Sequence, residues 1–469
     1  MNSPLFQHQP DEWFEGRRVT VMGLGQFGGG LGVVQWLHSL GARVLIADLS
    51  SEEKLSSSLA PLAAAIADGS ITLRLGEHQH IDFQQTDLVV ANAAVPRPWE
   101  NLFLNVARAA GVPVTSEICL TVQRLRTNRV VAITGSAGKS TMTAMTVCAL
   151  RASGREVRFG GNIGGSLLNP LGSLAISDRG WTVLELSSAQ LWWLSKASGF
   201  KGWSPTIGVL TNIAPNHVDW HGSVAHYIES KAQIRREQSA DDIFISSFGV
   251  EGNATAIRIA SESSAGAWWN DAWESDAPSA DSISLSIPGE HQRRNARIAL
   301  AITLACAKLD GEPACIDLAH TALSTFQGLE HRLQSVGTIQ GIRCFNDSKA
   351  TTPEATQLAI ASFEDISRIH LIVGGSDKKI DLSSIRDLAP RLAGLYAIGA
   401  TEEMLAPAPP ALRCGTLTNA IDSAFSRAKP GDILLLSPAC ASYGQYTNFE
   451  ERGKQFVQLV LARQMLNHC

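Results

Sequence analysis

The chain has 469 residues, of which 45% are hydrophobic and 18% charged, and its formal net charge is -5. This length predicts about three domains, and the small negative charge argues against a general affinity for nucleic acid or anionic membranes. The amino end, MNSPLFQHQPDEWFEG, has no apolar signal core, and no uncharged apolar run is long enough to span a bilayer. The 8 cysteines form no C-x-x-C pair, which argues against a zinc site or a disulfide framework and favours a cytoplasmic protein.

Up to about residue 126, apolar runs alternate with helical patterns, which predicts a parallel α/β sheet. The expected elements are strands at 17–25, 42–48 and 86–96, and a helix at 31–41 that a glycine ends.

A glycine-rich turn follows the first of these strands. Gly23, Gly25 and Gly28 match G-x-G-x-x-G, and Asp48 closes the next strand. This pattern is typical of a dinucleotide-binding turn. The residues alone leave two interpretations open, a nicotinamide enzyme or a turn that holds another phosphate ligand.

A second domain begins near residue 127, where TNRVVAITGSAGKST repeats the order of buried strand, small-residue turn and helix. WTVLELSS and PTIGVLTNI predict further buried strands of the same sheet. The stretch 261–282 is polar and rich in small residues, so it is expected to be an irregular surface excursion.

The segment TGSAGKST is a shortened P-loop that keeps G-K-[ST] between a strand and a helix. Small residues let backbone N–H groups approach phosphate oxygens at the positive end of the helix. Lys139 can neutralise the outer phosphates, and the Ser140 hydroxyl can bind Mg²⁺. A plain strand-to-helix turn is the alternative, and the presence of both side chains argues against it.

Three further residues become functional candidates only through their surroundings. Glu185 ends an apolar strand, where its carboxylate must be paired, metal-bound or at a solvated edge. His217 follows another strand and could bind metal or phosphate, whereas His221 and His226 are expected to be packed or surface residues. Lys231 lies in a helical stretch, where an ordinary lysine faces solvent.

A third unit is expected from about Gly328, with apolar strands that end in polar loops at 341–356, 369–379 and 431–446. In open parallel sheets, ligands gather at such carboxyl-end loops. Their hydroxyl and cationic side chains suit a small carboxylate ligand, although turn geometry alone also explains the glycines. The candidates are Asp347, Lys349, Thr351, Lys378, Ser442 and Phe449.

The motifs TGSAGKST, GGNIG, LELSS, NDSKAT, and SPACAS followed by NFEERG resemble, in this order, the Mur ligases. These are ATP-dependent amide ligases of peptidoglycan precursor synthesis, and thus of cell wall biogenesis, cell shape and cell division. NDSKAT together with SPACAS favours the glutamate-adding member. The resemblance implies a Rossmann-like UDP-binding domain at 1–126, a P-loop ATPase domain with a mostly parallel sheet at 127–328, and a Rossmann-like glutamate-binding domain at 329–469.

The same resemblance implies a reaction and its partners. ATP and two Mg²⁺ ions would convert the carboxylate of UDP-N-acetylmuramoyl-L-alanine to an acyl phosphate, which D-glutamate then captures. A monomer is expected, without nucleic acid or membrane insertion. The rival interpretations are another Mur-type or folylpolyglutamate-type ligase, an NAD-dependent oxidoreductase, and a catalytically silent nucleotide-binding protein.

The resemblance also assigns residues to ligands. The UDP part of the substrate would contact Gly25, Gln26, Phe27, Asp48 and Asn92. ATP would contact Gly135, Ser136, Ala137, Gly138, Lys139, Ser140, Thr141, Asn295, Arg332 and Asp347. One Mg²⁺ would bind Ser140 and Glu185, and the other would bind His217 and a carbamylated Lys231. Asn162 would contact the reacting group, Lys349 would lie near the phosphates, and glutamate would contact Thr351, Lys378, Ser442 and Phe449.

Three positions depart from the usual family pattern. Ala137 replaces an asparagine of the P-loop, and Gln292 replaces the first asparagine near the adenine. Asn216 stands before His217 where an aspartate is common, which removes a negative charge beside the expected metals.

Overall fold

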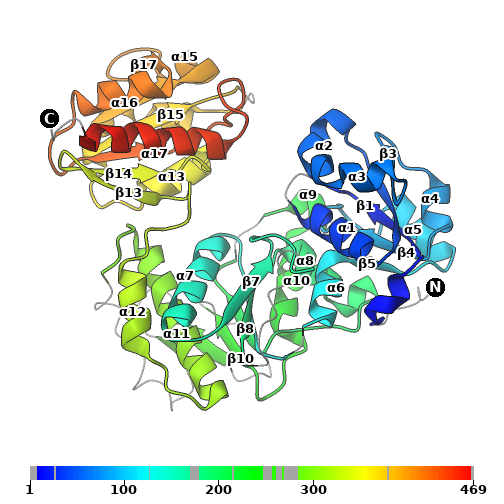
Figure 1. Ribbon diagram of the computed structural model, residues 1–469. Helices are drawn as coiled ribbons and strands as arrows, with labels where there is room; N and C mark the ends of the chain where they lie inside the picture. Colours follow the sequence, from blue (N-terminus) through cyan, green and yellow to red (C-terminus); the bar gives the residue numbers. More distant parts are fainter. Residues whose placement is uncertain are drawn as a thin grey trace. The chain divides into compact units, whose positions relative to one another are not determined.

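The computed structural model describes most of the chain, and its elements are labelled in Figure 1. The described residues are 8–25, 28–125, 127–168, 179–213, 216–246, 256–259, 267–268, 284–377 and 380–465. Backbone contacts divide the chain into two units, the first comprising residues 1–280 and 297–320 and the second comprising 281–296 and 321–469.

The first sheet is parallel in the described part of the chain, with the strand order β3-β2-β1-β4-β5. Its strands are β1 (Arg18–Met22), β2 (Arg43–Asp48), β3 (Ile71–Leu75), β4 (Leu88–Ala91) and β5 (Val114–Ser116). Its helices are α1 (Gly29–Ser39), α2 (Glu52–Leu59), α3 (Ala63–Ala67), α4 (His80–Gln84), α5 (Leu102–Ala109) and α6 (Glu117–Gln123). The three strands and the helix predicted from the sequence are therefore confirmed.

The second sheet has the order β12-β11-β10-β9-β6-β8-β7 among the described strands. These strands are β6 (Val130–Thr134), β7 (Val157–Gly161), β8 (Trp181–Glu185), β9 (Ile207–Leu210), β10 (Ile243–Ser246), β11 (Ala256–Ile259) and β12 (Ala267–Trp268). Only the β11–β12 pairing is antiparallel among those described, so the sheet is mostly parallel as expected. β12 lies inside the stretch 261–282, so the prediction of a wholly irregular excursion was wrong there, and the rest of that stretch lies outside the described residues.

The helices that follow the strands of this sheet include the long helix after the P-loop. They are α7 (Lys139–Ala152), α8 (Ser188–Trp193), α9 (Val218–His221), α10 (Val224–Arg236), α11 (Glu290–Asp310) and α12 (Ile316–Ser324). Helix α8 begins with a capping box, in which the Ser187 side chain accepts from the Gln190 N–H and the Gln190 side chain accepts from the Ser187 N–H.

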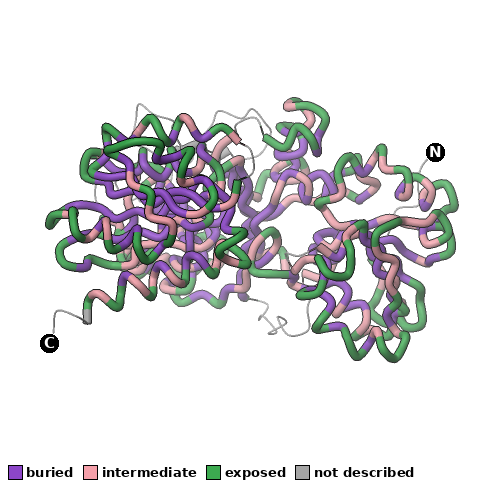
Figure 2. The backbone as a smooth tube through the Cα atoms, turned by 90° about the horizontal axis from the view of Figure 1, so that it is seen from above, coloured by how far each residue is buried: buried purple, intermediate pink, exposed green. Residues whose placement is uncertain are grey.

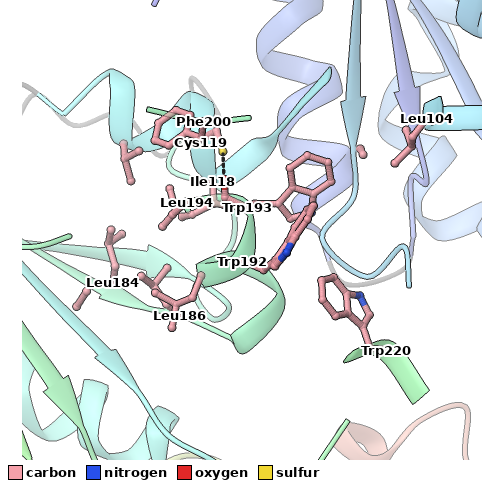
Figure 3. Packing of buried hydrophobic residues seen from close by; sticks show 14 of the residues in the cluster. Leu104, Ile118, Cys119, Leu184, Leu186, Trp192, Trp193, Leu194, Phe200 and Trp220 are labelled. Carbon is pink, nitrogen blue, oxygen red and sulfur yellow. Dashed lines mark hydrogen bonds between the residues drawn. The ribbon is translucent and has the colours of Figure 1, made fainter. Parts of the chain in front are cut away.

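The first and second sheets share one apolar cluster inside the first unit. Figure 3 shows Ile118 and Cys119, from a helix of the first sheet, beside Trp192 and Trp193 of α8, and Leu104 of the same cluster farther away. The Cys119 thiol donates to the Trp193 carbonyl at 3.2 Å. Since burial of this apolar surface stabilises the folded state, the cluster ties the two sheets together.

The third sheet lies in the second unit, and its order is β13-β14-β18-β15-β16-β17 among the described strands. These are β13 (Gln334–Ile339), β14 (Ile342–Asn346), β15 (Ile369–Gly374), β16 (Gly394–Ile398), β17 (Leu412–Gly415) and β18 (Ile433–Leu436). Its helices are α13 (Pro353–Ile360), α14 (Ser383–Arg386), α15 (Glu402–Leu405), α16 (Leu417–Phe425) and α17 (Phe449–Met465). The sheet is mixed because β13 pairs with β14 in antiparallel fashion.

Buried backbone runs through the interior of the molecule's parts, and exposed residues lie on their outside (Figure 2). β4, β6, β8, β15 and β18 are buried along their whole length, whereas the edge strands β3 and β17 are partly exposed. The predicted fold class, three α/β parts built on largely parallel sheets, is confirmed. Among the helices that could be assessed, none combines the length and the apolar character that crossing a membrane requires.

Candidate active site

A cavity of about 800 Å³ in the first unit is lined by the glycine turn after β1 and by Lys139, the lysine of the P-loop after β6. Five of the predicted site residues line it, namely Gly25, Asn92, Lys139, Asn162 and His217. The carboxyl ends of strands from two different sheets thus meet at one cavity.

Asp48 shapes the glycine turn at one end of this cavity. Its carboxylate accepts hydrogen bonds from the backbone N–H of Leu24 at 2.9 Å, of Gly25 at 3.2 Å and of Ser50 at 2.8 Å. A Cβ on Gly30 would lie 2.1 Å from the Leu24 carbonyl oxygen, so only glycine lets α1 approach the turn this closely. Asp48 is therefore part of the turn itself, and the predicted residues Gln26 and Phe27 lie outside the described residues.

Asn92 follows β4 and is hydrogen-bonded to the same glycine turn. Its side-chain Nδ2 donates to the Gly23 carbonyl at 3.1 Å, and its Oδ1 accepts from the Ala94 N–H at 2.9 Å. Gly23 has a φ of 87°, a left-handed conformation that glycine adopts without strain.

The P-loop at the other end of the cavity joins β6 to α7. Gly138 has a φ of 78°, and α7 begins at the next residue, Lys139. The Lys139 ammonium folds back and donates to the carbonyls of Gly135 at 3.0 Å and Ser136 at 3.3 Å. Ser140 is only 5% exposed in the first turn of α7, where the helix end favours anions.

Asn212, which the sequence interpretation missed, holds the P-loop in shape. Its Oδ1 accepts from the N–H groups of Ser136 at 3.0 Å and Ala137 at 2.9 Å, and its Nδ2 donates to the Ala137 carbonyl at 2.9 Å. Asn212 comes just after β9, the parallel neighbour of β6. The sequence does contain a signal for this role, because Asn212 is a polar residue at the carboxyl end of the strand next to β6.

Glu185 at the end of β8 is 1% exposed, so the interpretation of a solvated edge glutamate was wrong. Its Oε1 accepts from the Asn162 Nδ2 at 2.8 Å, while its buried Oε2 has no hydrogen-bond partner among the described residues. A buried carboxylate oxygen without a donor is costly, and a bound cation would remove that cost.

Lys231 on α10 is also 1% exposed, so its interpretation as a solvent-facing residue was wrong. Its Nζ donates to the Gly135 carbonyl at 2.8 Å and to the Thr134 Oγ1 at 3.2 Å. Burial, reinforced by the positive charge of Lys139, lowers the pKa of Lys231 to about 7. Near neutral pH a large share of this amine is therefore uncharged.

His217 lines the cavity with a φ of 49°, an uncommon left-handed conformation for this residue type. Partial desolvation, together with Lys139, lowers the pKa of His217, so its imidazole is neutral at pH 7 and able to bind a metal. No three His, Cys, Asp or Glu side chains converge on one metal-binding point within the described ranges. A magnesium ion here would take hydroxyl, phosphate and water oxygens besides the carboxylate of Glu185.

His221 and His226 pack against each other, as expected of residues without a direct role. Their Nδ1 atoms lie 2.9 Å apart, and the His221 Nε2 lies 2.9 Å from the Ser188 Oγ.

The second unit brings together most of the predicted strand-end residues of the third sheet. The Lys349 ammonium lies 4.7 Å from the centre of the Phe449 ring, and Ser442 is 4% exposed. The Ser348 Oγ donates to the Phe449 carbonyl at 2.8 Å, and the Ser376 N–H donates to the Ala441 carbonyl at 2.8 Å, so the three loops are joined. Thr351 is partly exposed just beyond these contacts, and Lys378 lies outside the described residues.

Asp347 in this cluster is held by neutral donors. Its Oδ1 accepts from the Leu333 N–H at 3.0 Å and its Oδ2 from the Ser437 Oγ at 2.8 Å. Burial raises the pKa of Asp347 to about 7, against the opposing effects of these donors and of Arg332. Asn295, also in the second unit, donates to the Gln292 Oε1 at 3.1 Å on α11.

Comparison with known proteins identifies the family. Residues 133–303 match the Mur ligase middle domain, and residues 331–440 match the "Mur ligase, glutamate ligase domain". A UDP-N-acetylmuramoylalanine–D-glutamate ligase of Acidobacterium capsulatum is 34% identical, over 96% of this chain and 97% of the relative. The enzyme of the same name from Anaeromyxobacter dehalogenans is 34% identical, over 95% of this chain and 97% of the relative.

A solved structure shares the fold. The MurF ligase from Thermotoga maritima in complex with ADP superposes with a TM-score of 0.53 at 16% identity, over 98% of this chain and 97% of that chain. The sequence relatives extend over nearly the whole chain. The two matched domains contain the P-loop and the loops after β14 and β15 of the third sheet. The chain therefore belongs to the Mur ligase family, as its motifs predict.

Proposed function

We propose that this protein is an ATP-dependent ligase that joins D-glutamate to UDP-N-acetylmuramoyl-L-alanine in peptidoglycan precursor synthesis, with release of ADP and phosphate. The observation that carries the proposal is the single cavity lined by the glycine turn and by Lys139 of the P-loop. An enzyme that transfers a phosphoryl group to a nucleotide-linked acid needs two anion-binding turns within one cavity. The names of the two sequence relatives support the same pair of substrates.

The glycine turn would hold the UDP part of the substrate. Backbone N–H groups before α1 and the positive end of that helix favour a diphosphate. Asp48 and Asn92 keep the turn in shape through the hydrogen bonds described above. The residues proposed for this subsite are Gly25, Gln26, Phe27, Asp48 and Asn92.

The first chemical step would take place at the P-loop. The alanyl carboxylate attacks the γ-phosphorus of ATP, the bond to ADP breaks, and an acyl phosphate forms. Because two anions must meet, Lys139 and the amino end of α7 would stabilise the developing charge. The residues proposed for ATP are Gly135, Ser136, Ala137, Gly138, Lys139, Ser140, Thr141, Asn295, Arg332 and Asp347.

Ser140, Glu185, His217 and Lys231 are proposed to hold Mg²⁺, which supplies positive charge to the phosphates when it is bound. The buried Oε2 of Glu185 supports this assignment, because no donor in the described structure satisfies it. Lys231 would serve as a carbamate. Its neutral amine can add to CO₂ and release a proton, which replaces a cation with a carboxylate-like ligand.

The second step would join the amino acid. The amine of glutamate attacks the acyl carbon, phosphate leaves, and the amine proton passes to solvent or to a nearby base. Asn162, which already bonds Glu185, would contact the reacting group, and Lys349 would lie near the phosphates. Thr351, Lys378, Ser442 and Phe449 are proposed to hold glutamate.

The three functional parts are proposed to be residues 1–126 for UDP, 127–328 for ATP and 329–469 for glutamate. We also propose a cytoplasmic monomer. The cysteines in the described part of the chain form no disulfides, as is usual in a reducing compartment.

The proposal is tested by phosphate release with ATP, Mg²⁺, UDP-N-acetylmuramoyl-L-alanine and a panel of D- and L-amino acids. We expect ADP, phosphate and one new amide with D-glutamate, and little turnover with L-glutamate. Absence of both ADP and amide with every amino acid would refute it. Preferred turnover with another amino acid would assign the chain to a different branch of the family.

A further inference from the structure

Arg452 is a fully buried cation on α17 that none of the proposed roles uses. The residue is 0% exposed. Its side-chain hydrogen bonds go to a hydroxyl and to backbone carbonyls, with no carboxylate partner among the described residues. The Nε donates to the Ser348 Oγ at 3.0 Å, and the Nη2 donates to the Ser348 carbonyl at 2.8 Å. The Nη1 donates to the Gly374 carbonyl at 3.4 Å, and both Nη atoms lie 3.2 Å from the Cys440 carbonyl.

These acceptors belong to the ends of three adjacent strands. Ser348 follows β14, Gly374 ends β15, and Cys440 follows β18, which pairs with both of the others. The loops that continue from these points carry Lys349 and Ser442, both proposed for the reactants. The packing is tight, since a Cβ on Gly375 would lie 2.1 Å from the Ala441 carbonyl oxygen and 3.1 Å from the Arg452 Nη1. One guanidinium thus sets the spacing of three loops.

No carboxylate within the described ranges forms an ion pair with Arg452. Burial lowers its pKa to about 10, so it stays protonated at neutral pH, and the groups that oppose this shift are Cys440 and Tyr446 rather than an acid. Carbonyl dipoles offset part of the cost of burying a cation, but an unpaired buried charge remains expensive. In a low-dielectric interior such a charge attracts an anion beyond hydrogen-bonding distance.

We propose that Arg452 is a positioning residue that fixes the three strand-end loops and provides the fixed positive charge which the anionic amino-acid substrate compensates on binding. The inference rests on the proposed function, because it takes glutamate as the ligand of these loops. Arg452 acts through the loops and through its field, without touching the substrate.

The test compares Arg452→Lys with Arg452→Met in steady-state kinetics of the full-length enzyme. We expect Arg452→Met to raise the KM for D-glutamate about 10- to 100-fold, because the fixed charge and the hydrogen bonds that join the three loops are both lost. The KM values for ATP and the UDP substrate should be nearly unchanged. Arg452→Lys keeps the charge but loses the forked geometry, so it should recover part of the affinity. Lys454→Met, which removes an exposed cation from the same helix, is the matched control and should leave all three KM values unchanged.

The Arg452→Lys variant also allows a second measurement, the pH dependence of the KM for D-glutamate, which a purely structural role of Arg452 would not change. A buried lysine loses its proton more readily than arginine, so its KM for D-glutamate should rise between about pH 7 and 9 while that of the wild type does not. This measurement needs only the Lys variant and therefore remains available if Arg452→Met fails to fold.

Equal impairment of both variants for all three substrates, or an unchanged KM for glutamate, would overturn the proposal. So would a KM of the Lys variant that does not depend on pH. Wild-type protein that makes no amide from glutamate would instead refute the proposed function, so the two failures are distinguishable.

Discussion

Two buried cations, Lys231 at the strand ends of the second sheet and Arg452 at those of the third, differ in what burial does to them. Both donate hydrogen bonds to backbone carbonyls. Burial lowers the pKa of Lys231 to about 7 and that of Arg452 to about 10. The amine can therefore lose its charge near neutral pH, whereas the guanidinium cannot. Similar burial thus suits one region to covalent or metal chemistry and the other to a permanent attraction for anions.

The largest expected effect comes from Lys139→Ala, which removes the cation of the P-loop but leaves Lys231 in place. We expect kcat to fall by about 10²–10³ or more, as for the loss of one group that stabilises transition-state charge. ADP formation in single-turnover experiments measures this directly. Lys201→Ala, at an exposed lysine of the same unit, is the control. Unchanged turnover of Lys139→Ala would remove the P-loop from the mechanism.

Glu185→Gln tests whether Glu185, whose charge acts on Lys231, holds a metal. Arg452 has no such carboxylate partner among the described residues. We expect the Mg²⁺ concentration for half-maximal activity to rise about 10- to 100-fold, in the range seen when groups around a metal site are altered. Thermal stability should not fall, because a neutral amide costs less to bury than a carboxylate. An unchanged Mg²⁺ dependence would contradict the metal assignment.

Lys231→Arg makes the second-sheet cation resemble that of the third sheet, because arginine keeps its charge and cannot form the carbamate. We expect activity to fall about tenfold or more, at the lower end of the range for altered metal sites. Intact-protein mass measurement under CO₂ should detect the carbamate in the wild type only. If Lys231→Arg retained full activity, the carbamate would be unnecessary.

The last prediction concerns stability rather than activity, and the acid of the third-sheet cluster, Asp347, whose pKa is raised from 3.8 to about 7. Between these values the unfolded chain has lost this proton and the folded chain keeps it, so the free energy of unfolding falls as the pH rises. The slope from this one group is at most about 1.4 kcal/mol per pH unit. Asp347→Asn should remove it in urea denaturation across this range.

Asp365→Asn is the matched control for that slope. Asp365 is an exposed acid of the same unit, and hydrogen bonds from Ser367 lower its pKa, so its titration lies below the window. A slope that persists in Asp347→Asn would mean that other groups cause it.

Local sequence patterns predicted the strands that bear the site, because continuous apolar runs such as Val130–Thr134 and Ile369–Gly374 mark buried parallel strands. Other strands were not predicted, among them β16, which is buried along its whole length, and two with weaker patterns. β5 has only three residues, and β7 ends in two glycines. Motif spacing likewise predicted the P-loop and the glycine turn, but the hydrogen bonds of Asn212 join residues far apart in sequence.

The burial of charged residues was the part that sequence could not supply. From sequence alone, a lysine in a helical stretch is expected to face solvent. Lys231 is buried because α10 packs against the end of a strand, where the lysine bonds the Gly135 carbonyl. Arg452 lay inside the motif NFEERG without an assigned role, since its carbonyl partners come from loops 12 to 104 residues away. Only the tertiary structure brings such partners together.

The apolar cluster shared by the first and second sheets has one more consequence. Buried residues of both sheets, among them Ile118, Trp192 and Trp193 (Figure 3), belong to one packed cluster, so the two ends of the cavity rest on the same core. The distance between the two ends of the cavity is then set by this core, and it would select substrates by the distance from their diphosphate to their carboxylate. An acid carried on a longer or shorter arm from its diphosphate would stop short of the reacting phosphorus or overshoot it, so selection by size would come from packing far from the reacting atoms.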